Sequence, residues 1–221
     1  MAELLTHAWP PYGLRLTTER LELGLPDLAA LSELARVAAD GVHDPDVMPF
    51  TVPWSDAGPA ARGRAVFQHV LGTVAAWSPH AWTLSLAVRH EGRIVGRQDL
   101  SGDDFAVTRQ VSTGSWLGRE HQGRGLGTEM RAAALHLAFA GLGAHWAVSS
   151  AMIDNPRSLA VSRKLGYRDD GTEIAAVRGE SRTVRRVRLD RRTWDERRTV
   201  RVAVTGLEAA LPLFGVVDGT A

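Results

Sequence analysis

The stretch Gln122–Thr128 has residue types that can hold a phosphate group. It reads QGRGLGT, so that Gly123, Gly125 and Gly127 alternate with larger residues, and a helical pattern follows at once. The first turn of a helix has unsatisfied N–H donors and a partial positive charge, and glycine lets phosphate oxygens approach the backbone. Arg124 adds charge. We expect a diphosphate-binding turn here; the alternative is a tight loop whose glycines only permit positive φ.

Two other phosphate motifs fit this stretch less well. A P-loop requires lysine directly after its last glycine, where this chain has Thr128; its only lysine, Lys164, lies far downstream. A dinucleotide-binding fingerprint follows a buried apolar strand, whereas the segment before these glycines, TRQVSTGSWL, is largely polar. Asp154 has a position from which it could contact a ribose, so this second alternative stays open.

The composition excludes several classes of protein. The formal net charge of +1 gives no reason to expect a nucleic-acid or membrane surface. The absence of cysteine excludes disulfides, thiolate metal sites and a cysteine nucleophile. The eight histidines form no i, i+4 pair on a helix, so we expect no metal site. The N-terminal residues do not resemble a signal peptide, and no apolar run is long enough for a membrane span. We therefore expect a cytoplasmic protein.

Hydrophobic periodicity predicts a mixed α+β fold in one domain over residues 1–221. Residues 1–13 are expected to form an N-terminal arm, 41–59 a proline-rich loop and 198–221 a C-terminal extension that either lengthens the sheet or meets a second subunit. Predicted strands cover residues 20–26, 82–88, 93–100, about 108–117, 144–151 and 182–190; predicted helices start at 27, cover about 60–76, follow the glycines, and cover 155–167.

A second motif follows the glycine stretch at a fixed interval. In NPRSLAVSRKLGY, Asn155 and Ser158 have i, i+3 spacing and share one face of a short helix. Taken alone, Asn155 would simply cap the helix before Pro156, and Ser158 would be a surface hydroxyl. Together with TTERLEL near the N-terminus and GSWLGREHQGRGLGTEM in the middle, however, the motif resembles the GNAT superfamily of acyl-CoA-dependent N-acyltransferases.

This resemblance extends from about residue 14 to 195. It is closest to the branch of ribosomal-protein N-terminal alanine acetyltransferases, and the loop GVHDPDVMPFTVPW and the tail are similar to a smaller subgroup assigned to succinyl transfer. The implied fold is a mixed, mostly antiparallel sheet, splayed between its fourth and fifth strands and flanked by helices. The implied co-substrate is acetyl-CoA or succinyl-CoA, without a metal.

The resemblance also implies which residues bind coenzyme A. Its diphosphate would lie on the glycine loop, and its pantetheine arm would pair with the preceding strand and approach the N-x-x-S pair. The implied cofactor-binding residues are Trp116, Leu117, Gln122, Gly123, Arg124, Gly125, Leu126, Gly127, Thr128, Asn155, Ser158 and Lys164.

The implied reaction is direct attack of a neutral primary amine on the thioester in a ternary complex, because no cysteine is available for an acyl-enzyme. A backbone N–H near Leu117 would stabilise the oxyanion. Ser158 is the candidate that would protonate the thiolate. Several family members carry a tyrosine acid seven residues after the motif asparagine, where this chain has Ser162. Ser158, Asn155 and His43 are thus the predicted catalytic residues, with His43 as the base and Glu173 and Glu180 as weaker candidates.

The acceptor pocket is expected beside the proline-rich loop, with Asp44, Trp54 and Ser115 as its candidate residues. A succinyl donor would need an arginine for its carboxylate. The candidates are Arg97, Arg182, Arg185, Arg186 and Arg188, although charged residues on strands are mostly solvated. Expected partners are an acyl-CoA and an amine acceptor, with a homo-oligomer as an open possibility. The alternative function is a non-catalytic acyl-CoA-binding or sensing protein of the same fold.

Overall fold

The backbone is arranged around one mixed β-sheet. The structure is a computed structural model that describes residues 2–216. Within that range the sheet has nine strands in the order β7-β8-β6-β5-β4-β3-β2-β1-β9. The strands are β1 (Arg15–Thr17), β2 (Leu21–Gly24), β3 (Ala81–His90), β4 (Arg93–Asp103), β5 (Gln110–Leu117), β6 (Trp146–Met152), β7 (Arg168–Val177), β8 (Glu180–Asp190) and β9 (Ala203–Thr205).

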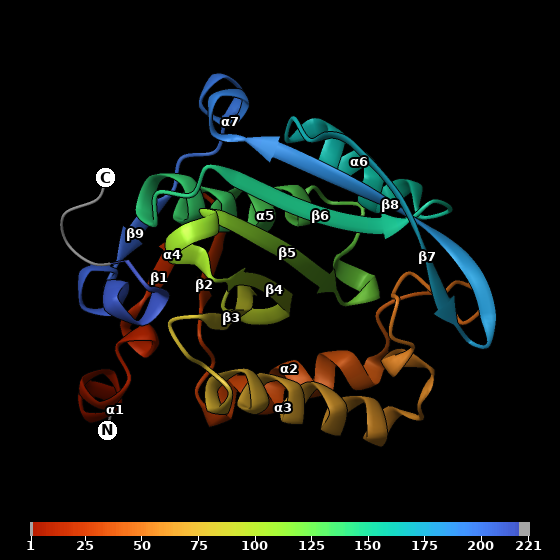
Figure 1. Cartoon of the computed structure of the whole chain (residues 1–221). Coiled ribbons are helices and arrows are strands. Elements are labelled where there is room, and N and C mark those ends of the chain that lie inside the picture. The colour runs from red at the N-terminus through yellow and green to blue at the C-terminus, as the bar shows by residue number, and fades with distance from the viewer. Residues whose placement is uncertain (1, 217–221) are drawn as a thin grey trace.

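Helices cover both faces of this sheet (Figure 1). Helices α2 and α3 pack together below β3 and β4, whereas α5 lies on the opposite face, next to α6. No helix within residues 2–216 is long and apolar enough to cross a membrane. The helices are α1 (Ala2–Ala8), α2 (Leu28–Asp40), α3 (Pro59–Ala75), α4 (Phe105–Thr108), α5 (Leu126–His136), α6 (Pro156–Lys164) and α7 (Arg191–Arg197).

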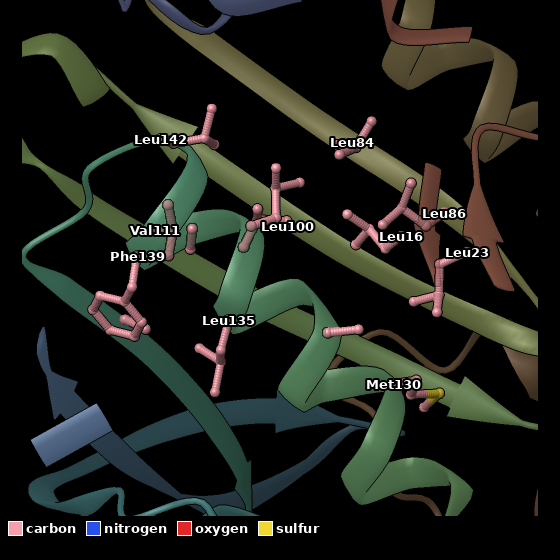
Figure 2. Packing of buried hydrophobic residues seen from close by; sticks show 14 of the residues in the cluster. Leu16, Leu23, Leu84, Leu86, Leu100, Val111, Met130, Leu135, Phe139 and Leu142 are labelled. Carbon is pink, nitrogen blue, oxygen red and sulfur yellow. The ribbon is translucent and has the colours of Figure 1, made fainter. Parts of the chain in front are cut away.

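The alternation of residues along each strand decides which helix it meets. In β3, Leu84 and Leu86 point into the main core with α5, while Ala87 packs in a second cluster with α2 and α3. Figure 2 shows the main core, in which Met130 and Leu135 of α5 are buried in one cluster with Leu84 and Leu86. Helix α2 begins where the sequence predicts, because the carboxylate of Asp27 accepts a hydrogen bond from the Ala30 amide.

The predicted fold class is confirmed, and the splay lies between β5 and β6, the fourth and fifth strands of the sequence-based prediction. Two segments have more regular structure than the sequence patterns predict. Residues 172–177, to which no predicted strand was assigned, belong to strand β7, which pairs with β8. The arm 1–13 contains helix α1 and a 3-10 turn at Pro10–Gly13, because AELLTHA is rich in good helix formers.

The C-terminal extension is part of the sheet and of the core, as far as residue 216. Strand β9 pairs antiparallel with β1, which places it at the edge of the sheet. The following 3-10 segment, Glu208–Phe214, buries Phe214 completely against Trp77 and Trp82, with ring centroids 5.2 and 4.8 Å apart. Of the two possibilities for the tail, the structure therefore shows sheet extension. The predicted extension continues to 221, and residues 217–221 lie outside the described range.

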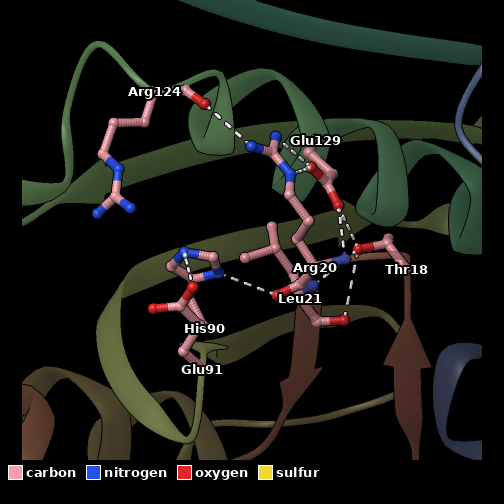
Figure 3. Close-up of polar contacts among 7 residues, drawn as sticks. All are labelled: Thr18, Arg20, Leu21, His90, Glu91, Arg124 and Glu129. Atoms are coloured by element: carbon pink, nitrogen blue, oxygen red, sulfur yellow. Dashed lines mark hydrogen bonds and ion pairs between the residues drawn. The ribbon is translucent and has the colours of Figure 1, made fainter.

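A polar clamp fastens the first turn of α5 to the turn between β1 and β2 (Figure 3). The carboxylate of Glu129 accepts hydrogen bonds from the Thr18 hydroxyl at 2.6 Å and from Arg20 Nε at 2.7 Å. Arg20 Nη1 also donates to the carbonyl of Arg124 at 3.1 Å. Thr18 and Arg20 belong to the TTERLEL motif, so the clamp explains why that motif accompanies the glycine stretch.

The clamp keeps Glu129 ionised although its side chain is largely buried. Burial alone would raise the pKa of this carboxyl, but the hydrogen bonds from Thr18 and Arg20 offset it and hold the pKa below its ordinary value of 4.5. A negative charge in the first turn also interacts favourably with the helix dipole.

We predict that Phe214→Ala lowers the free energy of unfolding by about 3 kcal/mol or more, because it removes a fully buried aromatic ring. Urea denaturation measures the change. Val107→Ala, at a side chain that is 85% exposed, is the control and should change stability by less than about 0.5 kcal/mol. Equal stability of both variants would show that the C-terminal segment does not belong to the folded core.

We predict that Glu129→Gln destabilises the protein at neutral pH and that the difference from wild type disappears in acid. A carboxylate whose pKa is lowered by folding contributes stability above its unfolded pKa of 4.5 and loses it as the pH falls through the lowered pKa. Thermal unfolding across this pH range tests the prediction. The control is Glu22→Gln, a change at an exposed residue, which should have little effect on stability. A stability difference that is independent of pH would contradict it.

Candidate functional site

Strands β5 and β6 form a fork. They pair in parallel only from Gln110 to Ser112 and from Trp146 to Val148. Just beyond this ladder, the Ser149 hydroxyl donates to the carbonyl of Thr113 at 3.0 Å. Residues 113–117 of β5 pair with β4 on one side but have no strand partner on the β6 side within residues 2–216. The carbonyls of Thr113 and Leu117 accept hydrogen bonds from the side chains of Ser149 and Gln122. The remaining main-chain groups on this side are available to an extended ligand that can hydrogen-bond like a strand.

The glycine loop lies directly at the end of this open edge. Gly123 and Gly125 have φ of 76° and 81°, conformations that disfavour other residues. Within the described chain, the amides of residues 123–127 make no hydrogen bond to a protein acceptor, whereas those of Thr128 and Glu129 bond to the carbonyl of Gly125. Residues 123–125 are exposed and Leu126 is buried, so the open amides are accessible while the loop is anchored in the core.

The space around these glycines is open as well. A side chain at Gly123 would meet no atom within 4 Å, and one at Gly127 would meet only Leu117 Cδ1, at 3.8 Å. Open amides at a helix start, without a Cβ to screen them, form the arrangement that binds phosphate oxygens. The residues present thus fit a diphosphate.

The side chain of Gln122 acts as a brace for the loop. Its amide nitrogen donates to the carbonyls of Val42 at 2.7 Å and Leu117 at 3.0 Å, and its oxygen accepts from Arg157 at 3.2 Å. It joins the end of α2, the end of β5 and the start of α6. Gln122 was expected to bind the cofactor with the rest of the loop, and its side chain here makes contacts within the protein instead.

Helix α6 borders the fork with Asn155 and Ser158. Asn155 Oδ1 accepts from the Ser158 amide at 3.1 Å, so it is the N-cap of this helix. The Ser158 hydroxyl makes no hydrogen bond to another described residue and is half-buried. Lys164 is exposed at the opposite end of α6, where a cation favours the helix dipole.

The other face of β5, toward α2 and α3, carries an aromatic row. Trp116 lies 5.8 Å from Trp54, Trp54 lies 5.3 Å from Phe50, and Phe50 lies 5.8 Å from His43, measured between ring centroids. The structure therefore places the predicted base His43 and the predicted pocket residue Trp54 in one row with Trp116. Asp44 is exposed beside Arg119, with 3.5 Å between the charged groups.

Both ring nitrogens of His43 already have partners. Nε2 lies 2.6 Å from the Ser55 hydroxyl and Nδ1 lies 2.8 Å from the carbonyl of Asp44. The other candidate bases, Glu173 and Glu180, are exposed on strands β7 and β8.

A histidine that the sequence analysis did not single out lies on the same face. His69 Nε2 of α3 is 3.7 Å from the carboxylate of Asp99 on β4, and the His69 side chain is 45% exposed. Asp99 also accepts from the Ser85 hydroxyl at 2.5 Å and pairs with Arg97 at 2.9 Å. Asp99 lies directly opposite Gly114 in the β4–β5 ladder. A Cβ added at Gly114 would meet no atom within 4 Å.

The charge of Asp99 is fixed by its neighbours. Burial alone would raise the pKa of this carboxyl, but the charge of Arg97 and the contacts with His69 and Ser85 hold it below the usual range. A buried, ionised carboxylate beside a partly exposed imidazole is an arrangement that orients the histidine for proton transfer. The sequence signal, an aspartate in a strand and a histidine in a helix, is too common to identify such a pair.

Four of the five arginines considered for a donor carboxylate have an acidic partner. Arg97 pairs with Asp99, Arg182 with Asp154, Arg185 with Asp169, and Arg188 with Asp170. The contact with Arg182 engages Asp154, which the nucleotide-binding alternative would have placed on a ribose. Among residues 2–216, no group of three or more His, Asp or Glu side chains could hold a metal ion.

Comparison with known proteins agrees with this geometry. The family described as Acetyltransferase (GNAT) domain matches residues 20–168, which include Arg20 and Glu129 of the clamp, the glycine loop and helix α6. Among solved structures, RimJ of Mycobacterium smegmatis in complex with CoA-disulfide aligns with a TM-score of 0.65 at 20% identity, covering 80% of this chain and 85% of that one.

Two further structures align over similar lengths. A GCN5-related N-acetyltransferase from Brucella melitensis has a TM-score of 0.63 at 22% identity, covering 82% of this chain and 80% of that one. A chimera of the spermidine N-acetyltransferase SpeG from Vibrio cholerae has a TM-score of 0.63 at 15% identity, covering 81% of this chain and all of that one. At these identities the likeness shows the fold, and the family match carries the assignment. The chain belongs to the GNAT acetyltransferase family.

Proposed function

We propose that this protein transfers an acetyl or succinyl group from coenzyme A to a primary amine, by direct attack within a ternary complex. The observation that carries the proposal is the set of open amides at residues 123–127, next to the unpaired edge of β5. The family match supports an acyl-CoA co-substrate.

The loop amides would hold the diphosphate, and residues 115–117 together with α6 would hold the pantetheine arm. The bound co-substrate supplies an activated acyl group as a thioester. The protein residues then orient the amine, remove its proton and stabilise the charges that develop. Ser158, whose hydroxyl is uncommitted, remains the candidate that protonates the departing thiolate.

The amine would approach from the α2–α3 face of β5. A hollow of about 380 Å³ lies on the α3 side of strands β3 and β4, with His69, Thr83 and Asp103 in its lining. An aspartate in the lining favours a cationic amine as it enters.

For the base we propose His69 oriented by Asp99, with His43 as the competing candidate. His69 has a carboxylate at one nitrogen and is partly exposed, whereas the two nitrogens of His43 contact Ser55 and the carbonyl of Asp44. A base must have a nitrogen free to receive the proton of the amine.

The choice between an enzyme and a sensor of acyl-CoA depends on turnover. Wild-type protein, acetyl-CoA or succinyl-CoA, and a panel of primary amines should release free thiol in proportion to acylated amine. Coenzyme A binding without thiol release, for either donor and any amine, would favour the sensor. The donor giving the higher kcat/KM would identify the transferred group.

We predict that Gly127→Val raises the Kd for coenzyme A about tenfold or more, because its side chain would intrude where phosphate is expected. The position does not require positive φ and has space for a Cβ, so the fold should tolerate the change. Calorimetric titration measures binding, and unfolding temperature checks the fold.

The matched control is Gly58→Val. Gly58 likewise lies at the start of a helix, and a Cβ added there would meet no atom within 4 Å. This variant should bind coenzyme A like wild type. If Gly127→Val also binds normally, or if NAD displaces coenzyme A at equal concentration, the loop is not a coenzyme A site.

We predict that His69→Ala lowers kcat about 100-fold or more without changing the Kd for coenzyme A, while His43→Ala has a smaller effect on kcat. Steady-state kinetics with a saturating amine distinguish the two variants. A large loss of kcat in His43→Ala with normal turnover in His69→Ala would return the role of base to His43.

A further inference from the structure

A buried arginine without an acidic partner lies on the α5 side of the fork. The side chain of Arg131, in the second turn of α5, is only 5% exposed. None of the described Asp or Glu residues forms an ion pair with it, and burial lowers the pKa of its guanidinium. An isolated buried charge is costly unless something compensates it, so this arginine requires an explanation.

Its hydrogen bonds reach across the fork. Nη2 donates to the Ser115 hydroxyl on β5 at 3.3 Å, and Nη1 donates to the Ser162 hydroxyl on α6 at 3.0 Å. Ser115 belongs to the unpaired part of β5. The hydroxyl of Ser162 in turn donates to the carbonyl of Ser158, one helical turn earlier. The guanidinium therefore lies between the strand and the helix that border the proposed thioester position.

The local groups leave its charge uncompensated. The hydroxyls of Ser115 and Ser162 are neutral, and Nε is enclosed without any hydrogen-bond partner among the described residues. The phenol of Tyr167, a titratable group that influences the pKa of Arg131, is also buried. Burial raises the pKa of this phenol despite the nearby guanidinium and the contact with Thr113, so Tyr167 remains neutral at neutral pH.

The proposed reaction generates an anion in this fork. The lone pair of the amine forms a C–N bond to the acyl carbon, the C–S bond breaks, and its electron pair goes to sulfur. The amine proton leaves to the histidine base, and the sulfur departs as a thiolate until it acquires a proton. A preorganised cation in a site shielded from water stabilises such a charge strongly.

We propose that Arg131 is a catalytic residue that stabilises the departing thiolate of coenzyme A, a role that rests on the proposed function. The guanidinium donates to the hydroxyls of Ser115 and Ser162, which position it between β5 and α6. Its charge stabilises the leaving group.

The test is a pH titration of coenzyme A bound to wild-type protein and to Arg131→Gln, followed by the difference absorbance of the thiolate. A nearby cation favours the thiolate. We expect the midpoint of thiol ionisation to rise by about one pH unit or more in Arg131→Gln, which is about a tenfold change in the ionisation constant. The Kd for coenzyme A at a pH where the thiol is protonated should change little, and kcat should fall. Arg131→Lys, which keeps the charge, should restore part of both effects.

Arg191→Gln is the matched control. Arg191 is the first residue of α7 and donates a hydrogen bond to the carbonyl of Phe139, not to a residue of the fork. This variant should leave the thiol midpoint unchanged. An unchanged midpoint in Arg131→Gln, or loss of folding in both Arg131 variants, would make Arg131 a structural strut and overturn the proposal. Weaker binding of succinyl-CoA alone, with an unchanged thiol midpoint, would assign Arg131 to the donor carboxylate and overturn it as well. If wild-type protein binds no coenzyme A, it is the proposed function that fails.

Discussion

The short pairing between β5 and β6 is the constraint on which the site depends. After three residue pairs the two strands separate, so one edge of β5 keeps unpaired main-chain groups close to the core. Unpaired backbone groups in such a position are costly unless water or a ligand satisfies them. The glycine loop follows at once and adds the open amides of a helix start. The open edge of β5 and the open amides of the glycine loop thus lie next to each other. An extended ligand that ends in a diphosphate could form hydrogen bonds with both.

Strand alternation gives this place two chemically different sides. Ser115 points toward α5 and α6, where it meets the buried cation of Arg131. Its neighbours Gly114 and Trp116 point toward α2 and α3, beside the Asp99–His69 pair and the aromatic row. One side therefore carries a buried cation suited to a leaving anion, and the other carries a carboxylate and an imidazole suited to an amine. A thioester held between them would face both sets of groups.

Local patterns in the sequence were sufficient for the central strands β2 to β6 and β8, for helices α2, α3, α5 and α6, and for the glycine turn. The alternation from Trp82 to Val88, the cap at Asp27 and the glycines at 123–127 each reflect short-range rules, and the structure follows them. The clamp from Thr18 to Glu129 and the pairs His69–Asp99 and Arg131–Ser162 join residues far apart in the chain. Their partners depend on strand register and helix rotation, which a single sequence does not encode in any short motif. Strand β7 escaped prediction because its residues are mostly exposed and lack clear alternation.

The most direct measurement of the central claim is the amide NMR spectrum of the isotope-labelled protein during addition of coenzyme A. The account predicts that the amide resonances of residues 123–127 move downfield as they form hydrogen bonds to phosphate oxygens, together with those of residues 115–117 on the open edge of β5. Resonances of the cavity beside the N-terminal arm, around Tyr12 and Arg15, should stay in place. Saturable binding that leaves residues 123–127 unperturbed would contradict the account.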